Sequence, residues 1–234
     1  MYKKIIILII LTLVILHNES FSWEFPTEEK CVSLEFKTDY MYLKDTPDSE
    51  LAQGQYNAFH CGKYFEAVTY NTELIKRHPD DFWLYAARAQ AKSALGDQTG
   101  AINDYKKQLS MNSEYKTPDR IANINFKIGF QYVSLHIKDF NVEYAQKAIP
   151  YFTEAIKNKP KYPEAFEWRG RCKYIVGDKT SNLQMINSGI QDLEYAKEQY
   201  LQLGYMSDYK KAIETYNEHL TYKQEYLKKH GLSK

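Results

Sequence analysis

The residues that could carry out chemistry are few in this chain, and their spacing does not bring them together. The six histidines are scattered, and none stands at a zinc-site spacing from a second ligand. Acid pairs such as Glu28-Glu29 and Asp80-Asp81 are adjacent in sequence, so they point apart or cap helices and do not resemble a general acid and base. No glycine-rich phosphate loop follows a strand. We therefore expect no enzymatic activity, no metal site and no cofactor.

The elements that would have to position any site are helices. Most of the 21 tyrosines lie at helical spacing, which indicates rings packed between helices with hydroxyls reaching water at the edges. Hydrophobic residues make up 44% of the chain and charged residues 26%, as in a folded protein. The net charge is only +1, and no block of Lys and Arg is longer than three residues. Nucleic acid, which normally needs a basic stripe, is therefore not an expected partner.

The first 22 residues have the pattern of an export signal. Lys3 and Lys4 precede an apolar core of twelve residues, Ile5–Leu16, and small residues follow at Ser20 and Ser22. Cleavage after Ser22 would give an exported protein, periplasmic or secreted. An uncleaved N-terminal membrane anchor is the alternative, although twelve residues are fewer than the ~20 that span a bilayer as a helix. We expect no stable membrane insertion after the signal is removed.

The strongest pattern in the sequence is a repeat of 34 residues. The segment GKYFEAVTYNTELIKRHP at 62–79 is echoed by GDQTGAINDYKKQLSMN at 96–112. This spacing places Gly62 over Gly96 and Ala67 over Ala101. Residues 148–160 repeat the second half of the pattern, and residues 166–178 repeat the first half. A period of 34 residues built from two helices resembles the tetratricopeptide repeat (TPR) family.

The resemblance implies an all-α fold, an antiparallel helix-pair solenoid that winds as a right-handed TPR superhelix and ends in a closing C-terminal helix. The expected organisation is a signal peptide at 1–22, an N-terminal arm at 23–50 that packs on the first repeat, about four TPR-like helix pairs at 51–204, and a capping helix at 205–234. Terminal repeats need such covers because they lack a neighbour. Repeats three and four each carry about seven extra residues. Longer helices or a protruding elbow would accommodate them.

One disulfide is expected from this arrangement. Of the three cysteines, Cys31 lies in the arm and Cys61 ends the first helix of repeat one, whereas Cys172 lies three repeats along the stack. An arm folded back on repeat one would bring Cys31 and Cys61 together, and an exported chain meets oxidising conditions. The alternative is that both thiols are buried and reduced. The residues around Cys31, at 31–36, could form a short strand or an irregular segment.

In TPR proteins the first helix of each repeat lines a concave groove that commonly binds extended peptides or partner helices. The lysine and asparagine clamp of one TPR subclass is absent here, because its positions hold residues such as Ala86, Ala87 and Gln90. For each groove candidate, packing against a neighbouring helix is the competing interpretation, most strongly for Phe126 and Phe130. Transferred position by position, the candidate ligand-binding residues are Tyr56, Phe59, Trp83, Gln90, Phe126, Phe130, Arg171 and Tyr174.

The resemblance implies a scaffold or adaptor that binds a protein or peptide partner in the groove. With the export signal, the expected role is the assembly of an envelope or secretion complex outside the cytoplasm. A structural homo-oligomer that uses exposed edges of the solenoid is the first alternative, and an enzyme accessory is the second. The sequence leaves the oligomeric state open.

Overall fold

The structure of this chain is a computed structural model that describes residues 26–229 and residue 231. The segment expected to be a signal peptide, residues 1–22, lies outside the described residues. The described part is all-α and contains no strand. Within it, no helix combines the length and the apolar character that a membrane crossing requires.

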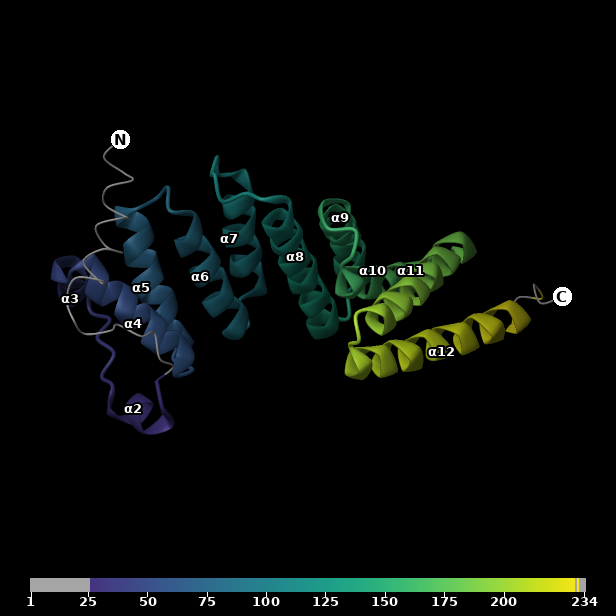
Figure 1. The fold of residues 1–234 in the computed structure, drawn as a ribbon, viewed down its shortest axis with the longest axis horizontal. Helices are drawn as coiled ribbons and strands as arrows, with labels where there is room; N and C mark the ends of the chain where they lie inside the picture. Colours follow the sequence, from purple (N-terminus) through teal and green to yellow (C-terminus); the bar gives the residue numbers. More distant parts are fainter. Residues whose placement is uncertain (1–25, 230, 232–234) are drawn as a thin grey trace.

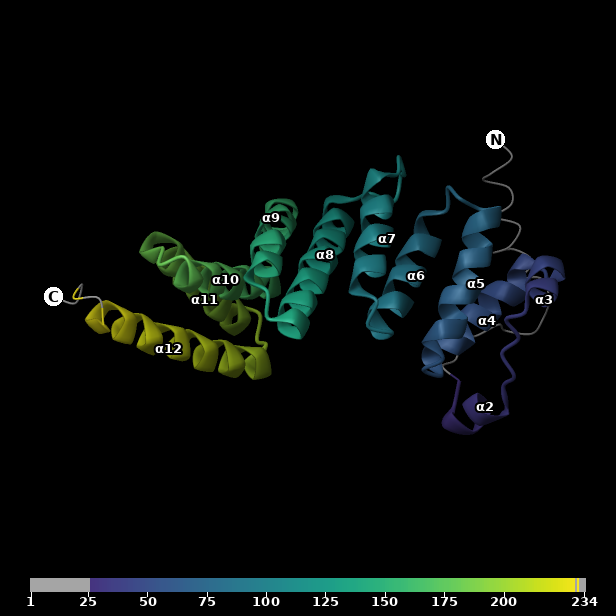
Figure 2. The same ribbon diagram turned by 180° about the vertical axis from the view of Figure 1, so that it is seen from behind.

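Four antiparallel helix pairs form the body of the molecule and stack side by side along its long axis (Figures 1 and 2). We number them repeats one to four. Their helices are α4 (Asp48–His60) with α5 (Tyr64–Arg77), α6 (Phe82–Ala94) with α7 (Gln98–Ser110), α8 (Pro118–Asp139) with α9 (Val142–Asn158), and α10 (Pro163–Lys179) with α11 (Leu183–Gln202). This is the helix-pair solenoid that the 34-residue spacing predicts.

Glycine in a left-handed conformation ends the first helix of repeats one and two. Gly62 has φ +72° and Gly96 has φ +82°, a region that side chains with a Cβ rarely adopt. The amide after each glycine donates to a carbonyl of the last helical turn, at 2.8 Å to Ala58 and 2.9 Å to Lys92. This closing motif satisfies carbonyls that a helix end leaves unpaired. It explains why the two glycines recur at the repeat spacing.

The extra residues of repeats three and four lengthen their helices. The helices of repeats one and two have 13 or 14 residues, whereas α8 has 22, α9 and α10 have 17 each, and α11 has 20. Only Phe140 and Asn141 connect α8 to α9, and Phe140 makes the turn with φ 51°. Of the two arrangements the sequence left open, the structure has the longer helices.

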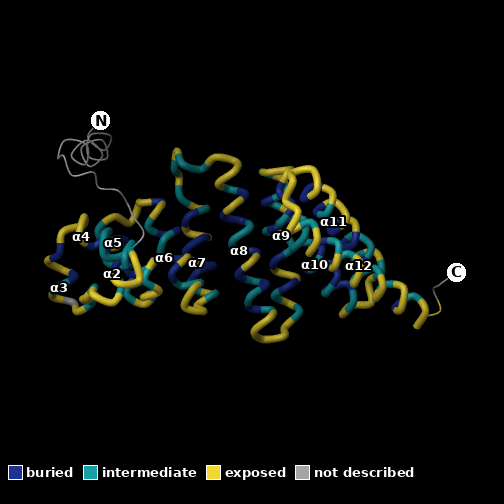
Figure 3. The backbone as a smooth tube through the Cα atoms, turned by 60° about the horizontal axis from the view of Figure 1, so that its bottom comes forward, coloured by how far each residue is buried: buried dark blue, intermediate teal, exposed yellow. Residues whose placement is uncertain are grey.

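Small residues mark the points where the two helices of a repeat cross. Ala67, Ala101 and Ala148 are fully buried at equivalent positions of the second helices. Repeat four has Gly189 there, and a Cβ added at Gly170 would lie only 2.7 Å from the Gly189 carbonyl oxygen. The helices of a pair therefore approach closely, and the buried positions follow the lines between them (Figure 3).

The N-terminal arm contains two short helices, α2 (Glu28–Ser33) and α3 (Tyr40–Asp45). The side chain of Thr27 caps α2 by accepting from the Lys30 amide at 3.2 Å, and Asp39 caps α3 in the same way. Residues 31–36 begin inside α2 and continue as irregular backbone, so the short-strand alternative for this segment is wrong.

The arm packs on repeat one through the guanidinium of Arg77, which lies in the last turn of α5. Arg77 donates to the backbone carbonyls of Leu43, Lys44 and Thr46 and forms an ion pair with Asp48 at 2.7 Å. Leu43 is buried in the core of repeat one. One side chain thus satisfies the end of α3 and fixes it to the first helix pair.

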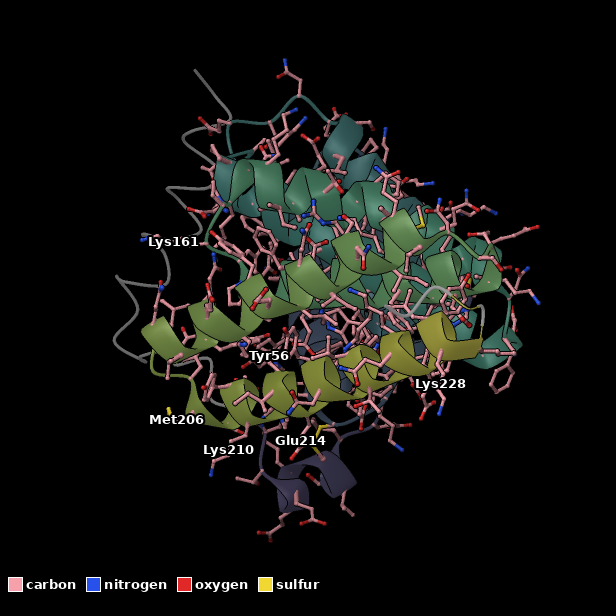
Figure 4. The ribbon with its side chains drawn as sticks, turned by 90° about the vertical axis from the view of Figure 1, so that its right-hand side faces the viewer. Tyr56, Lys161, Met206, Lys210, Glu214 and Lys228 are labelled. Atoms are coloured by element: carbon pink, nitrogen blue, oxygen red, sulfur yellow. A yellow bond between two sulfur atoms is a disulfide. The ribbon has the colours of Figure 1, made fainter. Side chains whose placement is uncertain are left out.

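The last helix, α12 (Met206–Lys229), packs on α11 at the other end of the stack. Ala212 and Thr215 are buried on its inner face. Figure 4 shows Lys210, Glu214 and Lys228 projecting outward from this helix, away from α11. A helix with one apolar face and one charged face is suited to cover the open end of a solenoid.

Candidate functional site

The first helices of repeats two and three enclose a hollow of about 520 Å³. Although α7 separates them in sequence, α6 and α8 both contribute to its wall, and α7 contributes one buried side chain, Gln108. The volume falls within the range of ligand-binding pockets. The lining residues are Phe82, Trp83, Ala86, Ala87, Gln90, Gln108, Asp119, Arg120, Asn123, Ile124, Lys127 and Lys159.

Trp83 and Gln90, two of the residues predicted for the groove, line this hollow. Trp83 is 46% exposed, and it lies in the first turn of α6, where the carboxylate of Asp81 caps the helix by accepting from the Trp83 amide at 2.7 Å. Its indole meets the Tyr115 ring at 5.6 Å and the Arg120 guanidinium at 5.0 Å. An indole held this way is a rigid apolar surface that remains open on one side.

Cations gather along the hollow. Arg120 and Lys127 come from α8, and Lys159 follows the end of α9. Burial lowers the pKa of the Lys127 ammonium from its ordinary value, because the charged form loses its hydration. The Arg120 guanidinium also donates to the Tyr115 carbonyl at 3.1 Å, which holds it beside Trp83. The wall opposite α6 is therefore positively charged.

Gln108, one of the residues that line the hollow, has a buried side-chain acceptor. Its side chain is only 2% exposed, and its Nε2 donates to the carbonyl of Phe82 at 3.2 Å. Its Oε1 is buried and accepts no hydrogen bond from the described residues. A buried polar atom without a partner costs free energy, and a ligand could recover it only if the amide turned toward the hollow. The amide groups of Gln90 and Asn123 also line the hollow and can both donate and accept.

Phe126 and Phe130 lie further along α8, outside the residues that line the hollow. Phe126 packs against Phe152 at 5.6 Å and against Tyr162 at 5.0 Å, so it belongs to the core between repeats three and four. Phe130 is 38% exposed and meets the Trp168 ring edge to face at 5.2 Å. These rings form a continuous aromatic contact between α8 and α10.

Arg171 and Tyr174 of α10 are covered by α12. The Arg171 guanidinium donates to Thr215 Oγ1 at 2.8 Å and to Glu167 at 2.6 Å. Tyr174 is buried against the rings of His219 and Tyr222. The closing helix thus occupies the surface that these two residues were predicted to offer to a partner.

In repeat one, Tyr56 and Phe59 lie apart from the hollow. The Tyr56 ring is half-buried and lies 4.3 Å from the His60 ring. Phe59 packs on the core of repeat one and meets Tyr64 at 5.5 Å across the turn between α4 and α5. Of the eight groove candidates, only Trp83 and Gln90 line the hollow, and Phe126 and Phe130 stack on each other outside it.

The structure joins Cys31 and Cys61, the expected pair, in a disulfide with their Cα atoms 5.4 Å apart. The bond ties α2 to the end of α4. Cys172 is free and buried in the core between repeats three and four, and burial raises the pKa of its thiol to about 12. In the part of the chain that the structure describes, no group of three or more His, Cys, Asp and Glu residues is placed to hold a metal ion.

Sequence reasoning missed Arg120, Asn123, Lys127, Lys159 and Gln108. The repeat register holds a signal for two of them: when Ala89 is aligned with Gly129, Trp83 falls on Asn123 and Ala87 falls on Lys127. Lys159 and Gln108 do not belong to first helices, so no rule that places the groove on first helices could have found them.

An all-α stack of helix pairs defines the class of helical-repeat solenoid proteins. Over 146 residues, 57% of this chain, the sequence is 27% identical to tetratricopeptide repeat protein 16 of Mus musculus. The chain spans only 18% of the length of that relative. No protein-family model matches this sequence.

Two solved structures share the architecture. The crystal structure of MamA has a TM-score of 0.54 at 16% identity, covering 70% of this chain and 85% of that one. MamA from residue 41 to its end, from Desulfovibrio magneticus RS-1, has a TM-score of 0.51 at 17% identity, covering 78% and 96%. The chain has the fold of TPR proteins, and the resemblance seen in the sequence is confirmed.

Proposed function

We propose that this protein is a non-enzymatic scaffold that binds a segment of a partner protein in the hollow between α6 and α8. The observation that carries the proposal is the exposed indole of Trp83 in a concave surface that also holds Arg120, Lys127 and Lys159. A large, partly exposed aromatic side chain in a concave surface is the kind of residue that dominates binding energy at interfaces. The solenoid supplies the rigid support.

Site-specific photo-crosslinking tests this proposal. A photoreactive residue at Ala87, inside the hollow, should form an adduct with one partner in extracts of the native host, and Trp83→Ala should abolish that adduct. Phe65 is an equally suitable position for comparison, because it is 64% exposed on α5, outside the residues that line the hollow. An adduct at position 65 that resists Trp83→Ala, with none at position 87, would place the interaction elsewhere.

The site of action that we propose is outside the cytoplasm, in an envelope or secretion complex. The export pattern at residues 1–22 supports this, and so does the pairing of Cys31 with Cys61, since disulfides persist in oxidising compartments. Intact mass and non-reducing peptide mapping of the protein from its native host should show a chain that begins near Trp23 and carries the bridge. A chain that retains residues 1–22 and needs detergent for extraction would establish the anchored alternative.

A homo-oligomer is the second candidate, and one surface favours it. Leu201, Leu203, Tyr205 and Met206 are each 45–51% exposed at the turn from α11 to α12. Figure 4 shows Met206 at the beginning of α12, at the end of the stack that faces the viewer. Apolar side chains grouped at one end of a solenoid are typical of a contact surface. Light scattering at micromolar concentration should separate a dimer from a monomer, and a monomer would remove this candidate.

A further inference from the structure

The cations around the hollow between α6 and α8 have no carboxylate partners. Within residues 26–229, Arg120, Lys127 and Lys159 form no ion pair. They lie over aromatic rings instead, as the Arg120 guanidinium lies 5.0 Å from the Trp83 ring. Asp119 is the single acidic residue in the lining, and it also forms no ion pair within residues 26–229. The lining therefore carries an excess of positive charge.

The cations of α6, in contrast, have a carboxylate partner. Arg88 and Lys92 both bind the carboxylate of Asp104 on α7, at 2.7 Å and 2.8 Å, and all three side chains are largely buried. At Lys127, burial lowers the pKa and no neighbouring carboxylate opposes this effect. A carboxylate entering the hollow would favour the charged ammonium and strengthen its own binding in this partly dry surrounding.

The neutral polar groups of the hollow fit the backbone of an extended chain. A peptide that runs through the hollow presents free N–H and C=O groups along its backbone. Gln90 and Asn123 lie on facing helices, and each can pair with both an N–H and a C=O of the same chain. Trp83 provides an apolar surface beside them.

We propose that the hollow recognises an extended acidic segment of a partner protein. Its Asp or Glu side chains pair with Arg120, Lys127 and Lys159, its backbone pairs with the amides of Gln90 and Asn123, and an adjacent apolar side chain packs on Trp83. This rests on the proposed function of the same hollow and adds the chemistry of the segment that binds there. Charge complementarity selects this occupant, because neither a neutral nor a basic segment would pair the three cations.

Fluorescence anisotropy with two matched peptides tests the proposal. The first is an extended peptide of about ten residues in which Glu alternates with Ser and Leu, and the second has Gln in place of every Glu. The acidic peptide should bind at least about tenfold more tightly than the Gln peptide, and added salt should weaken it selectively. Lys127→Met with Lys159→Met should remove that preference. The control, Lys210→Met on the outer face of α12, should leave it unchanged.

Gln90→Met separates the backbone contact from the charge contact. It replaces the amide with an apolar side chain of similar length, so both peptides should weaken by the same factor. Circular dichroism confirms that each variant is folded. Equal binding of the two peptides, or an unchanged preference after loss of Lys127 and Lys159, would overturn the acidic segment.

Two further outcomes locate the error if the acidic peptide does not bind. If Trp83→Ala still abolishes the crosslink at position 87, the hollow binds a partner of other chemistry and only the acidic segment is wrong. If that crosslink is also absent, the proposed function itself fails. Sedimentation with phosphatidylglycerol vesicles without peptide binding would show that the cations face a membrane surface, which contradicts the proposal.

Discussion

Repeats two and four differ from repeats one and three at one position of the second helix. The position lies three residues after the small residue at which the helices cross. Repeats one and three have tyrosine there, whereas repeats two and four have aspartate. The four residues, in chain order, are Tyr70, Asp104, Tyr151 and Asp192. The same position of the repeat therefore holds an aromatic side chain in two repeats and a carboxylate in the other two.

In repeat two, the aspartate holds two cations from the first helix. Asp104 accepts from Arg88 Nε at 2.9 Å and from Arg88 Nη2 at 2.7 Å, and it accepts from Lys92 Nζ at 2.8 Å. The guanidinium also donates to Thr72 Oγ1 at 3.3 Å on the second helix of repeat one. The arginine thus fixes the position of one repeat against the preceding one.

Repeat four reproduces this arrangement. Asp192 accepts from Arg169 at 2.8 Å and 2.7 Å and from Lys173 at 2.8 Å, and Arg169 Nη1 donates to Thr153 on the second helix of repeat three at 3.3 Å. Only 5% of the Asp104 side chain and 9% of the Asp192 side chain are exposed. Ion pairs buried this deeply set geometry more than they add stability.

Repeats one and three use packing instead. The ring of Tyr70 lies against Gly54, so that a Cβ on that glycine would be 3.1 Å from Cε2 of the ring. Tyr151 stacks on Tyr132 with ring centroids 5.6 Å apart, and Lys106 of repeat two lies over both rings. A tyrosine at this position tolerates the loss of one contact, whereas an aspartate between two cations does not.

The largest expected effect comes from neutralising the aspartates. Asp104→Asn or Asp192→Asn keeps the shape and leaves an arginine and a lysine buried without a negative partner, which should cost about 3–5 kcal/mol of unfolding free energy. Urea denaturation of the purified variants measures this. Tyr151→Phe is the matched change in repeat three and should cost less than about 1 kcal/mol.

Asp139→Asn, on an exposed carboxylate at the end of α8, controls for the loss of one negative charge. If the aspartate variants lose no more stability than this control, the buried ion pairs of Asp104 and Asp192 do not stabilise repeats two and four. In that case the contrast between the two kinds of repeat would be one of composition only.

A smaller effect is expected from the disulfide, which gives repeat one a covalent support in addition to its packing. The bridge joins residues separated by 30 positions, and its loss should lower the free energy of unfolding by about 3 kcal/mol. Cys31→Ser with Cys61→Ser should therefore speed hydrogen exchange in α2, α3 and α4 before it affects repeats two to four.

Reduction of the native protein with dithiothreitol should reproduce this result, and the same treatment of the double-serine variant should change nothing. Uniform loss of protection along the whole stack would contradict local support by the bridge. It would also show that repeat one and the later repeats unfold as one unit.

The fold could be predicted from the sequence because backbone sterics fix a few positions. The glycines at 62 and 96 are needed for positive φ, and the alanines at 67 and 101 are needed where helices cross, so their spacing carries the architecture. No comparable spacing in the sequence marks the two buried clusters of arginine, lysine and aspartate. Arginine and aspartate are 16 residues apart in repeat two and 23 apart in repeat four, so the longer helices hide their equivalence.

The site was predicted only in part for a related reason. The repeat register identifies which positions face the same side, and the structure places Trp83 and Gln90 on the wall of one hollow. The register says nothing of which surfaces a later helix covers. Helix α12 buries Tyr174 and accepts a hydrogen bond from Arg171. The angle at which α12 packs depends on its own side chains, which follow no repeat.

The smallest expected effect distinguishes two lysines that carry the same charge in different settings. Lys106 is exposed, lies 5.7 Å from the rings of both Tyr132 and Tyr151, and donates to Tyr132 at 3.2 Å. Lys106→Met should cost about 0.5–1 kcal/mol, because an exposed cation–π contact contributes little. Lys92→Met removes a bond to the buried Asp104 and should cost about 1.5–3 kcal/mol, although Arg88 still holds that carboxylate.

Urea denaturation of both variants, repeated at low and high salt, measures the difference. Both changes remove one positive charge, so the overall charge of the molecule cancels from the comparison. Salt should reduce the already small Lys106 effect, because exposed charges are screened, and should leave most of the Lys92 effect, because that pair is buried. Equal losses of unfolding free energy in the two variants would mean that the buried ion pair stabilises the protein no more than the exposed cation–π contact does. The contrast between repeats with aspartate and repeats with tyrosine would then be wrong.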